Sequence, residues 1–418
     1  MRAGRSWSIL GRVRRLVPIL SVAVAVLAAA PGAQAQRPNP LTVPDLFRDC
    51  GSQATTRPNQ PADPRGTNPA AANPLAGDSF FVDPSEQSAK DLVRYQRAGR
   101  RADAAAIAKL ALRPKARWLG AYTRPNMPKK VRNYMNCVQV FQPGATPLFT
   151  VLRHQGKQCN PRYDGGGVAE DNATKAWYRD LAGAIGDSRV VIAFEPDSIG
   201  TIECLARSRR QARKDLLRYG VDVLSQLPNA TIYLEGTASD WKSARFVASQ
   251  LRSMGIDKVR GFMLNVTHYD WTSKNIAFGR RVSRMVGGKP FVVSTSYNGR
   301  GPVSYTARSK KRVNVFCNPR FRGLGPAPTT KTGFDKVDAF LWLNRPGLSG
   351  AGACNGGPLP VGTWWPARAL MFGRYATDWV SPRRASRFGL SRRVSLCRLG
   401  APVSGGRYST VAPEKRCR

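Results

Sequence analysis

Two carboxylates follow a short apolar run in the middle of the chain. The five apolar residues Val190–Phe194 predict a strand that is buried on both faces. Pro196 cannot continue the hydrogen-bond ladder of that strand, so Glu195 and Asp197 are expected at its carboxyl end. A carboxyl group beside apolar walls has a raised pKa, which suits a general acid. Either residue could instead cap the following turn; this alternative stays open for Glu195, whereas for Asp197 we favour catalysis.

A repeating rhythm of short apolar segments and helical patterns runs along most of the chain. The segments that predict strands are 116–120, 147–152, 190–194, 231–234, 261–264, 291–293 and 339–343. The patterns that predict helices are about 83–112, 172–185, 202–227, 240–254, 273–286 and 365–375. Strands that alternate with helices form a parallel sheet, and this rhythm predicts an α/β fold, a distorted seven-stranded parallel β/α barrel of the TIM-barrel type. An open doubly wound sheet would look similar, but the sequence lacks a glycine-rich dinucleotide fingerprint.

Nearly every predicted strand ends on a polar residue. These residues are Arg153, Glu195, Glu235, Asn265, Ser294 and Asn344. Because parallel strands bring their carboxyl ends to one rim, we expect the active site there. The tryptophans nearest these strand ends are Trp118, Trp241, Trp271, Trp342, Trp364 and Trp365. Flat aromatic rings stack on sugar rings, so the set favours a carbohydrate ligand, although core packing would explain any single one of them.

The first 35 residues have the features of a secretory signal peptide. Five arginines precede an apolar run at 16–30, and Ala33-Gln34-Ala35 supplies small residues at a cleavage position. The run is too short to be a convincing membrane anchor. We therefore predict a secreted protein without a membrane partner after cleavage. The mature chain would then consist of a leader or linker rich in Pro and Asn at 36–72 and a barrel with a C-terminal extension at 73–418.

Composition restricts the partners of the chain. The formal net charge of +40 would suit a polyanion, but the basic residues are scattered and form no recognisable nucleic-acid module. We therefore expect no nucleic-acid partner and attribute the charge to a generally arginine-rich proteome. The eight cysteines contain no CxxC pair, and the chain has only two histidines. This pattern predicts disulfides in an exported monomer, with no metal site and no cofactor.

Seven short motifs occur in a fixed order between about residue 73 and residue 378. They are Asn73-Pro-Leu-Ala-Gly, Trp118-Leu-Gly, Glu195-Pro-Asp-Ser, Gly261-Phe-Met-Leu-Asn-Val, Ser296-Tyr-Asn-Gly, Phe316-Cys-Asn-Pro and Cys354-Asn-Gly-Gly-Pro. Each motif alone is weak, but the ordered set resembles glycoside hydrolase family 6, the cellobiohydrolases and endoglucanases. The resemblance implies a distorted seven-stranded α/β barrel and hydrolysis of β-1,4-glucan with inversion.

The resemblance also implies roles for individual residues. Asp197 takes the position of the general acid, and Trp271 lies where the family has a sugar-stacking tryptophan. We expect the substrate to be bound by Trp118, Trp271, Asn265, Asn298, Trp342 and Asn344. The family disulfides correspond to Cys159–Cys204 and Cys317–Cys354. The remaining cysteines would then pair as Cys50–Cys137 and Cys397–Cys417.

Several departures from the family pattern lie at positions that carry catalytic residues in the family. The assisting Asp of the family motif Gly-Arg-Asp-Cys is replaced by Gln158, which follows Lys157. In the motif that carries the candidate base, the Lys, Glu and Asp of the family become Asn344, Leu348 and Gly350. An inverting hydrolase needs a second carboxylate roughly 6.5–9.5 Å from the acid to activate water. This chain must therefore supply the base elsewhere or lack it.

The sequence offers three substitutes for the missing base. Glu235 and Asp240 flank a strand end and are the first choices, and Asp270 is the next. His268 stands where the family usually has Asn and is expected to be a hydrogen-bonding wall residue. Two hypotheses follow. In the favoured one, the chain is a secreted glucanase with Asp197 as acid and a relocated base. In the other, it is a catalytically impaired sugar-binding protein on a hydrolase scaffold.

Overall fold

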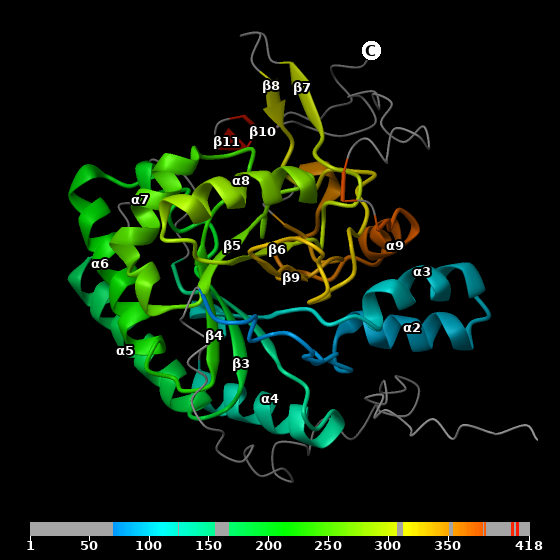
Figure 1. Ribbon diagram of the computed structural model, residues 1–418. Helices are drawn as coiled ribbons and strands as arrows, with labels where there is room; N and C mark the ends of the chain where they lie inside the picture. Colours follow the sequence, from blue (N-terminus) through cyan, green and yellow to red (C-terminus); the bar gives the residue numbers. More distant parts are fainter. Residues whose placement is uncertain are drawn as a thin grey trace, which may run out of the picture. The chain divides into compact units, whose positions relative to one another are not determined.

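Seven parallel strands form one sheet in the order β1-β2-β3-β4-β5-β6-β9 (Figure 1). The computed structural model describes residues 70–123, 125–154, 167–306, 312–350, 354–378 and 380–381, together with the backbone of 403–404 and 407–408. The strands of the sheet are β1 (Arg117–Gly120), β2 (Leu148–Leu152), β3 (Val190–Phe194), β4 (Ala230–Glu235), β5 (Gly261–Leu264), β6 (Phe291–Ser294) and β9 (Val337–Leu341). The sheet curls into a half-barrel, which confirms the predicted fold class.

The larger helices follow one another along the outer side of the sheet (Figure 1). They are α4 (Met127–Phe141), α5 (Val168–Ile185), α6 (Arg207–Leu224), α7 (Ala244–Met254) and α8 (Thr272–Met285), and each packs on the next. A second group consists of α2 (Gln87–Arg97), α3 (Arg101–Ala111) and α9 (Pro366–Arg374), with α3 between the other two. Two antiparallel pairs, β7 (Ser304–Thr306) with β8 (Arg312–Asn314) and β10 (Val403–Ser404) with β11 (Arg407–Tyr408), lie outside this sheet. Four short 3-10 helices complete the described elements: η3 (Ala121–Thr123), η4 (Ile202–Cys204), η5 (Ile256–Lys258) and η6 (Cys354–Gly356). No described helix combines the length and apolar character that a bilayer crossing requires.

Alternate side chains of β3 belong to two different cores. Val190, Ile192 and Phe194 pack with the outer helices, whereas Val191 and Ala193 face the interior of the half-barrel. This alternation is the period-2 pattern of a strand, and here both faces are apolar because helices cover the outer one. Helix α6 approaches β3 so closely that a Cβ on Gly220 would lie 2.6 Å from Phe194. The strand that carries the candidate acid is therefore held rigidly from both sides.

The half-barrel is open between β9 and β1, and hydrogen bonds bridge this seam. The backbone N–H of Ala116 donates to the carbonyl of Trp342 at 2.9 Å. The carbonyl of Leu343 accepts from Trp118 Nε1 at 2.8 Å and from Thr150 Oγ1 at 2.7 Å. Side chains thus satisfy backbone groups that a closed sheet would pair.

The structure departs from the predicted elements in the N-terminal half of the chain. The single helical stretch predicted for 83–112 is wrong, because α2 and α3 are separate helices. Gly99 adopts φ +67° between them, a conformation that glycine reaches at little cost and that ends a helix. Helix α4 was not predicted at all, although its buried Val131, Tyr134, Met135 and Val138 follow helical spacing.

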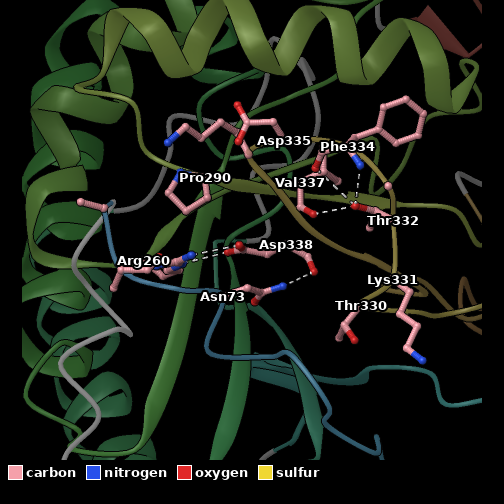
Figure 2. Close-up of a pocket in the computed structure, with 14 residues that line it drawn as sticks. Asn73, Arg260, Pro290, Thr330, Lys331, Thr332, Phe334, Asp335, Val337 and Asp338 are labelled. Atoms are coloured by element: carbon pink, nitrogen blue, oxygen red, sulfur yellow. Dashed lines mark hydrogen bonds and ion pairs between the residues drawn. The ribbon is translucent and has the colours of Figure 1, made fainter.

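A buried charge network closes the amino end of the half-barrel (Figure 2). The carboxylate of Asp338 accepts from Arg260 Nε at 2.9 Å, from Arg260 Nη2 at 3.0 Å and from Tyr233 Oη at 2.7 Å. Its backbone carbonyl accepts from Asn73 Nδ2, which ties the chain entering the domain to β9. Asn73, Arg260 and Asp338 also line a cavity of about 500 Å³. This end lies opposite the rim expected to carry chemistry.

Two neighbouring ion pairs allow the stability contribution of this network to be tested. We expect Arg260→Met to lower the free energy of unfolding by about 3–5 kcal/mol, because it leaves the buried Asp338 carboxylate without a cation. Lys258→Met is the matched control, since Lys258 pairs with Asp222 at the surface, where the two side chains are 39% and 41% exposed. That change should cost less than about 1 kcal/mol. Chemical denaturation of both variants measures the difference, and equal costs would contradict this account.

Candidate active site

The carboxylate of Glu195 joins the carboxyl ends of β2 and β3. It is fully buried and accepts three hydrogen bonds, from the backbone N–H groups of Arg153 and His154, each at 2.9 Å, and from Tyr178 Oη at 2.7 Å. Burial raises the pKa of Glu195 to about 7, against the lowering effect of these three donors. Because both oxygens are engaged inside the protein, Glu195 positions the strand ends and does not reach a substrate.

Asp197 lies two residues further on, where the chain leaves the strand. Its side chain is partly exposed, and its Oδ1 accepts from Thr267 Oγ1 at 2.6 Å. Burial raises the pKa of Asp197, although the Thr267 hydroxyl and the charge of His268 oppose this effect. The second carboxylate oxygen makes no hydrogen bond to the described residues. Asp197 therefore offers a carboxyl group that retains its proton more readily than a free aspartic acid.

Glu235 at the end of β4 contacts the backbone of the candidate acid. It is only 2% exposed, and its carboxylate accepts from the backbone N–H groups of Thr237, at 2.9 Å, and of Asp197. Burial, together with the charge of Asp197, raises the pKa of Glu235 well above its ordinary value. A general base must be ionised and must reach water. Glu235 has neither property, and its contacts are those of a group that positions Asp197.

Asp240 and His268 form a hydrogen-bonded pair near Asp197. His268 Nδ1 lies 2.8 Å from Asp240 Oδ1, and Asn314 Nδ2 donates to Asp240 Oδ2. Burial raises the pKa of Asp240, but the charge and hydrogen bond of His268 outweigh it, so the pKa is lowered. The imidazole ring stacks on Trp241, at 4.8 Å between centroids, and contacts Phe316 at 4.3 Å. Asp240 is thus an ionised carboxylate with both oxygens occupied.

Asp270, the third substitute for the base, belongs to a buried hydrogen-bond network. Its carboxylate accepts from Ser239 Oγ and from the backbone N–H of Trp271. Its backbone carbonyl accepts from the side-chain amides of Asn265, at 3.2 Å, and of Asn298, at 3.0 Å. The two asparagines that were expected to bind substrate therefore hold the loop after β5. Their predicted contact with substrate remains a prediction.

The remaining predicted substrate contacts differ in their exposure. Trp118 and Trp271 are partly exposed, as a stacking surface requires. Trp342 is 2% exposed and donates its Nε1–H to the carbonyl of Pro326, so it packs in the core. Asn344 is partly exposed and donates to the carbonyl of Val266 at 3.0 Å. Trp241, Thr267 and Phe316 were not predicted as site residues, although Trp241 was noted among the aromatic residues near the strand ends.

No carboxylate replaces the lost base in the described part of the loop after β9. The N–H of Gly350 donates to Asn318 Oδ1 at 2.9 Å, and Asn318 Nδ2 donates to the carbonyl of Cys354. The predicted disulfide Cys317–Cys354 is confirmed, with 6.0 Å between its Cα atoms. It fixes this loop beside the rim.

Some of the predicted residues cannot be placed. Cys137 and Cys204 are disulfide-bonded. Their predicted partners Cys50 and Cys159 lie outside the described residues, as do Lys157, Gln158, Cys397 and Cys417. The pairings Cys159–Cys204, Cys50–Cys137 and Cys397–Cys417 therefore stay predictions.

Two neighbouring carboxyl groups with raised pKa values, together with partly exposed tryptophans at the carboxyl rim of a parallel half-barrel, define a candidate hydrolase site of the α/β-barrel class. The family model described as "Glycosyl hydrolases family 6" matches residues 75–374, and the chain belongs to this family. The predicted family resemblance is confirmed.

Relatives of known identity agree with this assignment. The chain is 32% identical over 305 residues to Endoglucanase A of Cellulomonas fimi. The aligned region covers 72% of this chain but only 62% of that protein. It is 28% identical to Endoglucanase 1 of Streptomyces halstedii, covering 72% of this chain and 92% of that one. Among solved structures, the endoglucanase Cel6 from Mycobacterium tuberculosis is similar, with a TM-score of 0.63 and 33% identity, over 73% of this chain and 99% of that chain.

The Glu195 clamp predicts a pH dependence of stability. A carboxyl whose pKa is raised on folding stabilises the native state fully below its unfolded pKa, and this contribution is lost as the pH rises through the folded value of about 7. We expect the advantage of the wild type over Glu195→Gln in unfolding free energy to shrink by about 3 kcal/mol between pH 4.5 and pH 7. Denaturation midpoints across this range measure it, and parallel curves for the two proteins would contradict it.

Proposed function

We propose that this chain hydrolyses β-1,4-glucan or a related polysaccharide with inversion, and that Asp197 is its general acid. The observation that carries the proposal is the partly exposed Asp197 carboxyl at the carboxyl end of β3, with a raised pKa and one oxygen that makes no hydrogen bond to the described residues. Relatives named endoglucanase and a solved endoglucanase complex with a cellobioside-type ligand support this substrate class. Nothing in the reaction requires a metal or a cofactor.

The acid acts on the bridging oxygen of the glycosidic bond. An alkoxide leaving group on a sugar is very basic, so cleavage needs a proton delivered to that oxygen. Thr267 donates to Oδ1 of Asp197 and thereby fixes the carboxyl plane. The proton then belongs on the other oxygen, which makes no hydrogen bond to the described residues. Glu235 supports the acid, because its carboxyl holds the backbone N–H of Asp197 and resists a second negative charge beside it.

The proposed setting of the reaction is extracellular. A signal peptide at 1–35, a leader at 36–72 and disulfides throughout the mature chain suit a secreted monomer that meets its polysaccharide outside the cell. The confirmed Cys317–Cys354 bridge supports this compartment. Intact-mass measurement of the exported protein tests the proposed cleavage after residue 35.

A second candidate function is sugar binding with little turnover. The observation that favours it is the loss of the family base, since Leu348 and Gly350 carry no carboxylate. Under this alternative, the rim would still bind oligosaccharide through its tryptophans. Measuring turnover and binding on the same protein separates the two candidates.

We expect Asp197→Asn to abolish hydrolysis of unactivated glucan while it leaves oligosaccharide binding intact. Substrates with a good leaving group need little protonation and should lose much less activity. Reducing-end release from glucan, turnover of an aryl cellobioside and calorimetric binding of a cello-oligosaccharide are the three measurements.

The outcomes of this experiment discriminate the possible roles. If the variant loses binding and both activities together, Asp197 maintains the fold and is not the acid. If the wild type binds the oligosaccharide but turns over neither substrate, the chain is a sugar-binding protein.

A further inference from the structure

The hydrolysis proposed above needs a base that activates water, and none of the rim carboxylates described in the structure is suited to act directly. Glu235 is buried and its pKa is raised. The oxygens of Asp240 are occupied by His268 and Asn314, and Asp270 is committed to Ser239 and to the backbone. We propose that the imidazole of His268, oriented by Asp240, is the general base of this enzyme. This inference rests on the proposed glucanase function and names the group that the family motif lacks here.

The hydrogen bonds around His268 assign its two ring nitrogens different roles. Asp240 Oδ1 accepts the Nδ1–H at 2.8 Å, and this bond places the lone pair of the neutral ring on Nε2. No described residue hydrogen-bonds Nε2. The atom is not fully buried, in contrast to Nε2 of His154, which is buried without a hydrogen-bond partner. Nε2 of His268 therefore reaches the surface on a side chain that is only 9% exposed, and it makes no hydrogen bond to the described residues.

Two aromatic contacts restrain the orientation of the ring. Trp241 stacks on it with an interplanar angle of 22°, and Phe316 contacts it at 49°. Asn314 donates to Oδ2 of Asp240 and fixes the carboxylate that orients the ring. The aromatic contacts and the Asn314–Asp240 bond together give a preorganised base, which suits a group that must meet water at one defined position.

His268 also belongs to the same loop as the partner of the acid. Thr267 donates to Asp197 Oδ1, and the charge of the next residue, His268, lowers the pKa of Asp197. Among the described residues, the charged groups that interact with the imidazole are Asp197, from the end of β3, and Asp240, from the segment after β4; Glu235 in turn interacts with Asp197. A single loop thus sets the positions of both acid and base.

The proton transfers balance over one turnover. As the oxygen of water bonds to the anomeric carbon, one water proton moves to Nε2 of His268. The bond between the anomeric carbon and the bridging oxygen breaks, its electron pair stays on that oxygen, and the proton of Asp197 moves there. Imidazolium is then paired with the Asp240 carboxylate, and Asp197 is ionised. His268 returns its proton to solvent, and Asp197 takes one up, so the net change is the addition of one water.

Kinetics of His268→Gln and Asp240→Asn test this assignment. A positioned general base contributes about 10²–10⁴-fold, so His268→Gln should lower kcat on glucan about 100-fold or more with little change in KM. The acidic limb of the pH–rate profile, which reports protonation of the base, should disappear in this variant. Asp240→Asn should lower kcat less and shift that limb. The double variant should be no slower than His268→Gln, because Asp240 acts only through His268.

Azide provides a readout that a structural role would not change. The azide anion needs no deprotonation, so sodium azide should restore turnover of an aryl cellobioside by His268→Ala and yield the α-glycosyl azide. It should not restore glucan hydrolysis by Asp197→Asn, which lacks the acid. Oligosaccharide binding to every variant, measured by calorimetry, reports whether the site has kept its fold.

The results separate failure of this inference from failure of the proposed function. If the wild type hydrolyses glucan and His268→Gln retains its rate within about threefold, His268 is not the base, while the glucanase function stands. The inference also fails if the effects of the two substitutions multiply, or if azide restores nothing to a variant that still binds sugar. A wild type that turns over no glucan overturns the proposed function itself.

Discussion

The rim depends on one buried carboxylate, that of Glu195. A carboxylate accepts several hydrogen bonds, and here it takes the backbone N–H groups that follow β2 and the hydroxyl of Tyr178 from α5. Without Glu195, these three donors would be buried without a hydrogen-bond partner. Leaving three donors unpaired would cost more free energy than the burial of the one carboxylate that serves them all. The clamp fixes two neighbouring strand ends and a helix relative to one another. The chain then turns, and Asp197 emerges at a defined place.

The acid and base functions proposed for this rim correspond to carboxylates in opposite environments. Asp197 lies beside the buried Glu235; burial raises the pKa of both carboxyl groups, and the charge of Asp197 raises that of Glu235 further. Asp240 is paired with His268 and Asn314, and its pKa is lowered. When the environment of a site pushes the pKa values of two titratable groups apart, the group with the raised pKa usually acts as the acid and the other as the base. In the proposed mechanism the ionised Asp240 acts through the imidazole of His268, in place of the carboxylate lost at Gly350.

The sequence predicts the sheet well and the site only in part. Nearly every strand is an apolar run followed by a polar residue, so the positions of the strands and of the rim could be predicted. The apolar residues of α4 follow helical spacing, so this helix is predictable from the sequence, whereas the helix break at Gly99 shows there only as one glycine in a helical pattern. The hydrogen-bond partners of the site residues could not be predicted from the sequence. Asp240 and His268 are 28 positions apart and meet because β4 and β5 are neighbours in the sheet.

Backbone strain gathers at the same strand ends. Glu195, Asp197, Thr237 and Asn265 all have positive φ, between 54° and 68°, and they follow β3, β4 and β5. Non-glycine residues adopt this conformation at a cost of about 1–3 kcal/mol each, so it persists only where other contacts determine it. Here the contacts are the Glu195 clamp, the bond from Thr237 N–H to Glu235 and the amide of Asn265 on the loop that carries His268. A sheet that needed only stability would end its strands without this strain. The strained residues include Asp197 itself and lie directly beside the contacts that hold Asp197 and the loop carrying His268.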